Sequence, residues 1–199
     1  MRIFMFLLLL LLLLLLLCRC HSQEGNPVVD LRPDREQDFL VVDHSMQLDY
    51  EGLVKLADSL VCDSIFVQFS LTPEGSDTTY LLSPLGWCKE TTVCILRKPR
   101  NVLVLSMEAI DDLFASGQLE DELLNHMLNR EKNLAHAERP SKAIIFFDAP
   151  NTAPIHQVED ALGKLAVAFD RMHQHISNEL PFLPFQIGRQ WPDPIEVVK

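Results

Sequence analysis

The sequence contains few of the residues from which catalytic loops are built. Only 7 of its 199 residues are glycine, and no Gly-rich loop of the type that binds phosphate is present. Neither a Cys-x-x-Cys pair nor a His-Glu-x-x-His motif occurs, so the common redox and zinc spacings are missing. Asp43-His44-Ser45 holds the residue types of a hydrolase triad, but adjacent residues cannot form a relay that is assembled from separated segments. We therefore predict no catalytic residue and no cofactor.

Metal ligands are not predicted either. Asp170, His173 and His175 lie close together in the sequence, within a segment of helical periodicity. Asp170 and His173 share one face of such a helix, whereas His175 points elsewhere. A solvated helix surface explains this pattern better than a metal site does.

Positive charge is also scarce. The chain has 17 Lys and Arg residues against 28 Asp and Glu residues. Removal of residues 1–22 as a leader would leave 15 basic against 28 acidic residues, a net charge of −13. This balance argues against nucleic acid or an anionic membrane surface as a partner. The remaining 177 residues or so suit one compact domain.

The longest apolar run is at the N-terminus. Residues 3–17 are Ile-Phe-Met-Phe followed by eleven leucines, and Arg2 is the positive flank. As a helix the run would be about 22 Å long, shorter than the ~30 Å hydrocarbon core of a bilayer. Its length favours a secretory signal peptide over residues 1–22, with a cleavage site at Cys20-His21-Ser22. The alternative is a short membrane anchor over residues 3–17. Both place the domain outside the cytoplasm, in the periplasm or secreted.

The cysteines suit an oxidising compartment. Of the five, Cys18 and Cys20 would leave with the leader. Cys88 and Cys94 flank a turn-like sequence, so we expect a disulfide between them that closes a hairpin-like loop. Cys62 would then be unpaired, and we expect it to be a small buried apolar residue.

Two stretches of the chain share one pattern without a gap. Phe39–Asp43 and Ile144–Asp148 are each an apolar run that ends in aspartate, 105 positions apart. Each is followed at the same offset by apolar residues at helical spacing, from Tyr50 in the first copy and Ile155 in the second. The sequence therefore predicts a duplicated strand–loop–helix unit. The expected fold class is α/β (α+β), a small mixed sheet with two or three amphipathic helices packed on it.

The remaining patterns divide the chain into a linker over 23–37, a domain over 38–180 and a Pro-rich, aromatic tail over 181–199. The domain contains two half-units, 38–71 and 93–178. The tail is expected to be extended, either packed on the domain or offered as a binding strand. The expected elements are strands at 38–42, 64–71 and 142–147, a hairpin of 93–96 with 102–105, and helices at 50–61, 118–138 and 155–178.

The candidate binding residues are Asp43, Tyr50, Asp148 and Trp191. Asp43 and Asp148 each end a strand, where α/β folds place functional groups. The alternative role for both aspartates is to cap the loop or helix that follows. Trp191 lies in the aromatic tail.

The segment from Gln47 to Leu60, Gln-Leu-Asp-Tyr-Glu-Gly-Leu-Val-Lys-Leu-Ala-Asp-Ser-Leu, followed by Ser64-Ile65-Phe66-Val67, resembles the periplasmic domain of the ExbD/TolR biopolymer-transport family. Residues 93–178 are similar to that domain in their ββαβα order. The resemblance implies an extracytoplasmic module of a transport system. The chain departs from the family at Asp43-His44-Ser45 and Asp148-Ala149-Pro150, where an Arg-x-Asp-like triplet is typical. The proton-responsive aspartate of the family's membrane helix is also missing from residues 3–17.

Together these observations predict a non-enzymatic extracytoplasmic binding or scaffold protein, an accessory to transport. Its expected partner is an envelope protein, a cell-wall polymer or a second copy of the chain. It would contact the membrane only through an uncleaved N-terminal segment. The alternative is a secreted hydrolase or redox enzyme that acts through Asp43 and Asp148 or through Cys62.

Overall fold

Seven short strands form two sheets in the computed structural model, which describes residues 26–33, 36–85, 99–129, 132–176 and 182–188. The strands are β1 (Val28–Asp30), β2 (Asp38–Val42), β3 (Ile65–Leu71), β4 (Thr79–Leu82), β5 (Val102–Ser106), β6 (Ile144–Asp148) and β7 (Phe185–Ile187). The helices are α2 (Tyr50–Leu60), α3 (Met107–Ala115), α4 (Leu119–Leu128) and α5 (Ile155–Ile176). One sheet has the order β1-β4-β3-β2 and the other β5-β6-β7. The predicted fold class is confirmed, although the strands divide between two sheets.

The duplicated pattern in the sequence corresponds to two βαβ units. In the first, β2 leads through α2 to β3, and the two strands pair in parallel. In the second, β6 leads through α5 to β7, and these strands also pair in parallel. The crossover helix α2 contacts β3 of its own unit, whereas the crossover helix α5 contacts β3 and β4, which belong to the other sheet.

The two units are joined at equivalent positions of the duplicated pattern. The joining segments are Leu48–Tyr50 and Ala153–Ile155, 105 positions apart, with an isolated antiparallel bridge between Asp49 and Pro154 at their centre. The last residue of each segment donates its N–H to the carbonyl of the first residue of the other, at 2.8 and 3.0 Å. If the two units are exchanged, each of these two hydrogen bonds takes the place of the other. The junction therefore has local twofold symmetry.

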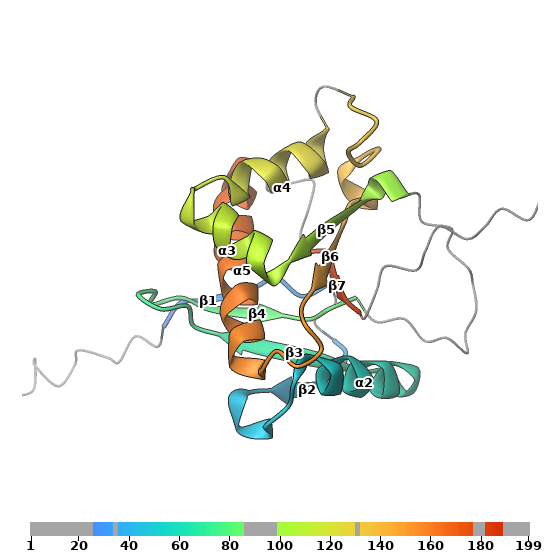
Figure 1. Ribbon diagram of the computed structural model, residues 1–199, viewed down its shortest axis with the longest axis vertical. Coiled ribbons are helices and arrows are strands. Elements are labelled where there is room, and N and C mark those ends of the chain that lie inside the picture. Colours follow the sequence, from blue (N-terminus) through green and yellow to red (C-terminus); the bar gives the residue numbers. More distant parts are fainter. Residues whose placement is uncertain (1–25, 34–35, 86–98, 130–131, 177–181, 189–199) are drawn as a thin grey trace, which may run out of the picture.

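Helix α5 is the central element of the core. It contacts α3 and α4 along part of its length and β3, β4 and α2 along the rest (Figure 1). The predicted apolar face of this helix is confirmed, because all of its residues are buried: Val158, Ala161, Leu162, Leu165, Ala168, Phe169 and Met172. A 22-residue helix with such a face packs both halves of the chain into one core.

The expected helix over 118–138 is wrong in its length. Helix α4 ends at Leu128, and Asn129 takes a left-handed conformation with a φ of 41°. The Asn129 side-chain amide then donates to the carbonyls of Asn133 and Ala137 at 3.0 and 2.8 Å. An asparagine that caps a helix and holds the next loop by its side chain stops the helix, although the apolar spacing continues in the sequence.

The segments expected as the linker and the tail both contribute to the domain. Within the expected linker, Val28–Asp30 forms β1 and pairs in parallel with β4, and Leu31 is buried. Within the expected tail, Phe185–Ile187 forms β7, and Leu183 is fully buried. This part of the tail is therefore packed on the domain. Short strands without a clear period are completed by their partners, which a local pattern does not reveal.

Of the expected hairpin of 93–96 with 102–105, the described residues include the second strand. Val102–Ser106 is β5, and it pairs in parallel with β6. Residues 93–96 lie outside the described residues, as do Cys88, Cys94 and Trp191. Within the described ranges no helix is both long enough and apolar enough to cross a membrane.

Cys62 differs from its expected state. It lies in the 3-10 helix Val61–Asp63 that follows α2, where it is exposed and disulfide-bonded. The expectation of an unpaired, buried Cys62 is therefore wrong. A sequence spacing identifies neighbours along the chain, whereas a disulfide joins cysteines that the fold brings together.

We predict that non-reducing peptide mapping of the folded protein recovers Cys62 in a cross-linked peptide, because its sulfur is bonded. Mass spectrometry before and after reduction measures this and identifies the second cysteine. Quantitative alkylation of Cys62 without prior reduction would contradict the prediction.

His126 is a buried titratable group in the last turn of α4. It is 1% exposed, and its Nε2 lies 3.3 Å from the Asn101 carbonyl. Burial lowers the pKa of His126, and the neighbouring His136 ring lowers it further, against the effect of the bond to Asn101. The folded protein therefore keeps this ring neutral at a pH where the unfolded chain takes up a proton.

We predict that the free energy of unfolding falls as the pH drops below about 6.5, since only the unfolded state then protonates His126. Above that pH the stabilisation is complete, and the loss continues down to the lowered pKa of the folded state. Urea unfolding at pH 7.5, 6.5 and 5.5 measures the effect. His126→Gln should flatten this dependence, whereas the exposed-site control His156→Gln should retain it. Equal slopes in both variants would contradict the assignment.

Candidate ligand cleft at the junction of the two units

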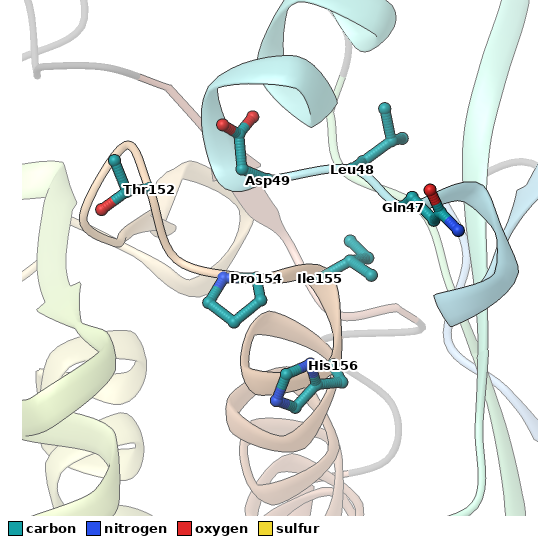
Figure 2. Close-up of a pocket in the computed structure, with 7 residues that line it drawn as sticks. All are labelled: Gln47, Leu48, Asp49, Thr152, Pro154, Ile155 and His156. Atoms are coloured by element: carbon teal, nitrogen blue, oxygen red, sulfur yellow. The ribbon is translucent and has the colours of Figure 1, made fainter.

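An open cleft of about 420 Å³ lies where the two βαβ units meet. One wall is Gln47–Asp49, the segment that leads into α2. The other wall comes from Thr152 and from Pro154–His156, at the start of α5 (Figure 2). Gln47 and Thr152 are at equivalent positions of the duplication, 105 apart, as are Asp49 and Pro154. The cleft therefore lies at the local twofold axis.

Local sequence explains why this region is shaped as a cleft. The Asp49 carboxylate accepts a hydrogen bond from the Gly52 N–H at 2.8 Å, which starts α2 at Tyr50. Gln47, just before it, has a φ of 50° and ends the 3-10 helix His44–Met46. On the other side, Pro154 begins the turn into α5. Two helices thus start on either side of one backbone bridge, and the space between them is lined by the residues that precede α2 and by the first residues of α5.

The polar side chains of the cleft divide into two groups. The Asp49 carboxylate accepts the hydrogen bond from the Gly52 N–H that caps α2. Gln47, Thr152 and His156 are exposed and take part in no side-chain hydrogen bond or ion pair among the described residues. They offer an amide, a hydroxyl and an imidazole in a cleft whose lining also includes the apolar residues Leu48 and Ile155. Such a set can donate and accept hydrogen bonds from a polar ligand while covering an apolar part of it.

Tyr50 is placed by the structure beneath the junction. It is fully buried, and its hydroxyl donates to the Phe147 carbonyl at 2.7 Å and accepts from the Gly188 N–H at 3.2 Å. Its ring packs edge-on against Phe147 at 5.8 Å. Burial raises the pKa of Tyr50 far above its usual value, and the nearby Asp148 also raises it. Tyr50 therefore joins the first unit to the second by hydrogen bonds, and its side chain does not line the cleft.

The other candidate binding residues are not brought together at the cleft. Asp43 is exposed, and its carboxylate accepts a hydrogen bond from the Ser45 N–H at 2.8 Å as the cap of the 3-10 helix. Asp148 is half-buried at the end of β6, opposite Ser106 of β5. Neither aspartate lines the cleft. The capping role for Asp43 is thus confirmed, and Trp191 lies outside the described residues.

Two of the three residues with metal-like spacing, Asp170 and His173, have structural contacts. The Tyr80 hydroxyl donates to the Asp170 carboxylate at 3.3 Å, and the His173 ring stacks on Phe169 at 5.8 Å. In the part of the chain that the structure describes, no three His, Cys, Asp or Glu side chains are grouped as metal ligands.

Sequence reasoning did not identify Gln47, Thr152 and His156. Each is an ordinary polar residue in a loop or a first helical turn, and no motif marks it. The duplication was the one available signal, since it aligns Gln47 with Thr152 and predicts that the two loops are equivalent. That the loops also lie side by side follows from the bridge between them.

Comparison with known proteins adds no relative. No protein-family model, curated protein or solved structure matches this chain.

We predict that Tyr50→Phe lowers the free energy of unfolding by about 1–3 kcal/mol, because it leaves the buried Phe147 carbonyl and Gly188 N–H without their partner. Urea unfolding followed by circular dichroism measures this. The matched control is Tyr80→Phe, the same change at the other tyrosine, whose longer bond is only partly buried. A loss at Tyr80 equal to or larger than that at Tyr50 would contradict the role given to Tyr50.

Proposed function

We propose that this chain is a non-enzymatic extracytoplasmic binding domain whose ligand enters the junction cleft. One observation carries the proposal: Gln47, Thr152 and His156, from both units, line one open cleft (Figure 2) and contribute no side-chain bond to the fold among the described residues. Polar side chains that the fold does not use, gathered in a concave site, are what a binding site requires.

The arrangement supports binding better than the hydrolase or redox alternative. Asp43 and Asp148 lie away from the cleft, and Asp43 acts as a cap. Cys62 is disulfide-bonded and therefore is not a resident thiolate nucleophile. Among the described residues, His156 forms no hydrogen bond to a carboxylate that would orient its ring, and none to the Thr152 hydroxyl that it could activate. No observation favours a second function.

The chemistry of the cleft limits the class of ligand. Its volume of about 420 Å³ is that of a small-molecule site or of one unit of a polymer. An amide, a hydroxyl and an imidazole in a cleft also lined by apolar residues suit a sugar or short peptide unit, which presents hydroxyl or amide groups beside apolar carbons. A unit of this kind occurs in a cell-wall polymer and in an exposed loop of an envelope protein, the partners expected from the sequence.

We predict that the variant Gln47→Ala/Thr152→Ala/His156→Ala folds with an unchanged melting temperature and binds ligand at least tenfold more weakly. The three native side chains are exposed and make no side-chain bond among the described residues, so their loss should affect the cleft alone. The measurement is NMR chemical-shift mapping of the secreted chain, titrated with soluble cell-wall glycopeptide fragments.

The matched control is Gln157→Ala, an exposed residue next to His156 on α5 that does not line the cleft. Binding by this control should equal that of the wild type. If the fragments shift no resonance from 47–49 or 152–156, or if the triple variant binds as well as the wild type, the cell-wall ligand is rejected. The same titration with a soluble envelope-protein fraction then tests the remaining partner class.

A further inference from the structure

The two βαβ units differ at one edge of their sheets. In the second unit, β6 has a neighbour on each side, with β7 after the crossover helix and β5 on the opposite edge. In the first unit, the equivalent strand β2 pairs with β3 after the crossover helix. Its opposite edge carries no strand among the described residues. Among the described residues, the position that β5 fills in one unit therefore carries no strand in the other.

The register of β5 shows how that position is filled. Strand β5 runs parallel to β6, from Val102 opposite Ile144 to Ser106 opposite Asp148. The duplication places Phe39 at the position of Ile144 and Asp43 at that of Asp148. A strand added to β2 in the same way would run parallel to it along residues 39–43. The backbone groups of an edge strand are a ready template for such pairing.

The side chains of β2 give this edge an apolar strip. Residues alternate between the two faces of a sheet, and Val42 faces the core while Phe39 and Val41 lie on the face away from it. Val41 is 45% exposed, and the Phe39 ring lies 6.5 Å from that of Phe66 on the neighbouring strand. The Arg32 guanidinium covers Phe39 at 4.6 Å. An incoming strand with apolar residues at alternate positions would extend this strip.

The charge at both ends of β2 limits the occupant. Asp38 begins the strand and Asp43 follows it, and both are exposed. If β2 paired in antiparallel fashion with β2 of a second copy, each copy's Asp38 would lie near the Asp43 end of the other. Like charges in such cross-strand positions repel. A segment with basic residues beside its apolar run matches the edge better.

We propose that the outer edge of β2 binds an extended segment of a partner protein, parallel to β2, with alternating apolar residues and a basic N-terminal flank. The site is separate from the junction cleft. Binding would add a strand to the first sheet, as β5 does in the second. The main-chain bonds supply the affinity, and the Asp38 carboxylate with the Phe39 and Val41 side chains supplies the selectivity.

The chain itself contains a sequence with these properties. Residues 97–106 are Arg-Lys-Pro-Arg-Asn-Val-Leu-Val-Leu-Ser, a basic flank followed by the β5 sequence. A synthetic peptide of this sequence is therefore a suitable probe, because β5 already pairs in this way with β6, the equivalent strand. A scrambled peptide of the same composition controls for attraction by charge alone.

The test is fluorescence anisotropy of the labelled peptide with the secreted chain, together with the variants Val41→Lys and Val104→Lys. Val104 lies on β5 and is 52% exposed, so the two variants make the same change at similarly exposed edge-strand positions. We expect Val41→Lys to weaken binding at least tenfold and Val104→Lys to leave it unchanged. Asp38→Lys reverses the charge at the exposed start of β2 and should also weaken binding at least tenfold. This variant replaces Val41→Lys in the test if Val41→Lys does not fold.

Amide hydrogen exchange provides a second readout, since peptide binding should slow exchange within residues 38–42. Three results would overturn the proposal: no binding by the wild-type chain, equal binding of the scrambled peptide, or loss of binding in Val104→Lys rather than in Val41→Lys. Concentration-dependent dimerisation of the wild-type chain that Val41→Lys abolishes would also overturn it, in favour of a second copy at this edge. None of these outcomes bears on the cleft, which the Gln47→Ala/Thr152→Ala/His156→Ala variant tests separately.

Discussion

The reciprocal backbone pairing between Leu48–Tyr50 and Ala153–Ile155 is the constraint on which the rest of the structure depends. It joins the two βαβ units at the point where α2 and α5 begin, and so it fixes where both helices start. The Tyr50 hydroxyl reinforces it from below through the Phe147 carbonyl. These hydrogen bonds are buried or join equivalent residues of the two units. Loss of one bonding group therefore leaves its partner on the opposite unit without a hydrogen bond.

The junction also explains where the candidate ligand cleft lies. Loops that lead into helices carry polar residues, and here two such loops face each other across a backbone bridge. Asp49 starts a helix, whereas Gln47, Thr152 and His156 have no structural task among the described residues. A duplicated fold thus forms a cleft from two ordinary loops, and neither loop would form it alone. The two copies also differ in their neighbouring strands, since β6 pairs with β5 on the edge at which β2 has no partner among the described residues.

Several features could be read from the sequence because they depend on local spacing. The apolar runs before Asp43 and Asp148 predicted two strands, and the helical period after Ile155 predicted the buried face of α5. Features that depend on distant partners could not be read in this way. Strand β1 is defined by β4, and β7 by β6. The end of α4 depends on what the Asn129 amide reaches eight residues later.

The sequence by itself determined the repeated unit, the fold class and the acidic character of the chain. Each of these follows from residue order and composition, which folding does not alter. Only the tertiary structure decided that the strands form two sheets, that Cys62 is exposed and bonded, and that Asp43 is a cap. It also decided that Gln47 and Thr152 share a cleft. Apart from the Asp43 cap, which is a local hydrogen bond to the Ser45 N–H, these facts require residues far apart in the chain to meet. That is decided by burial and hydrogen bonding across the whole domain.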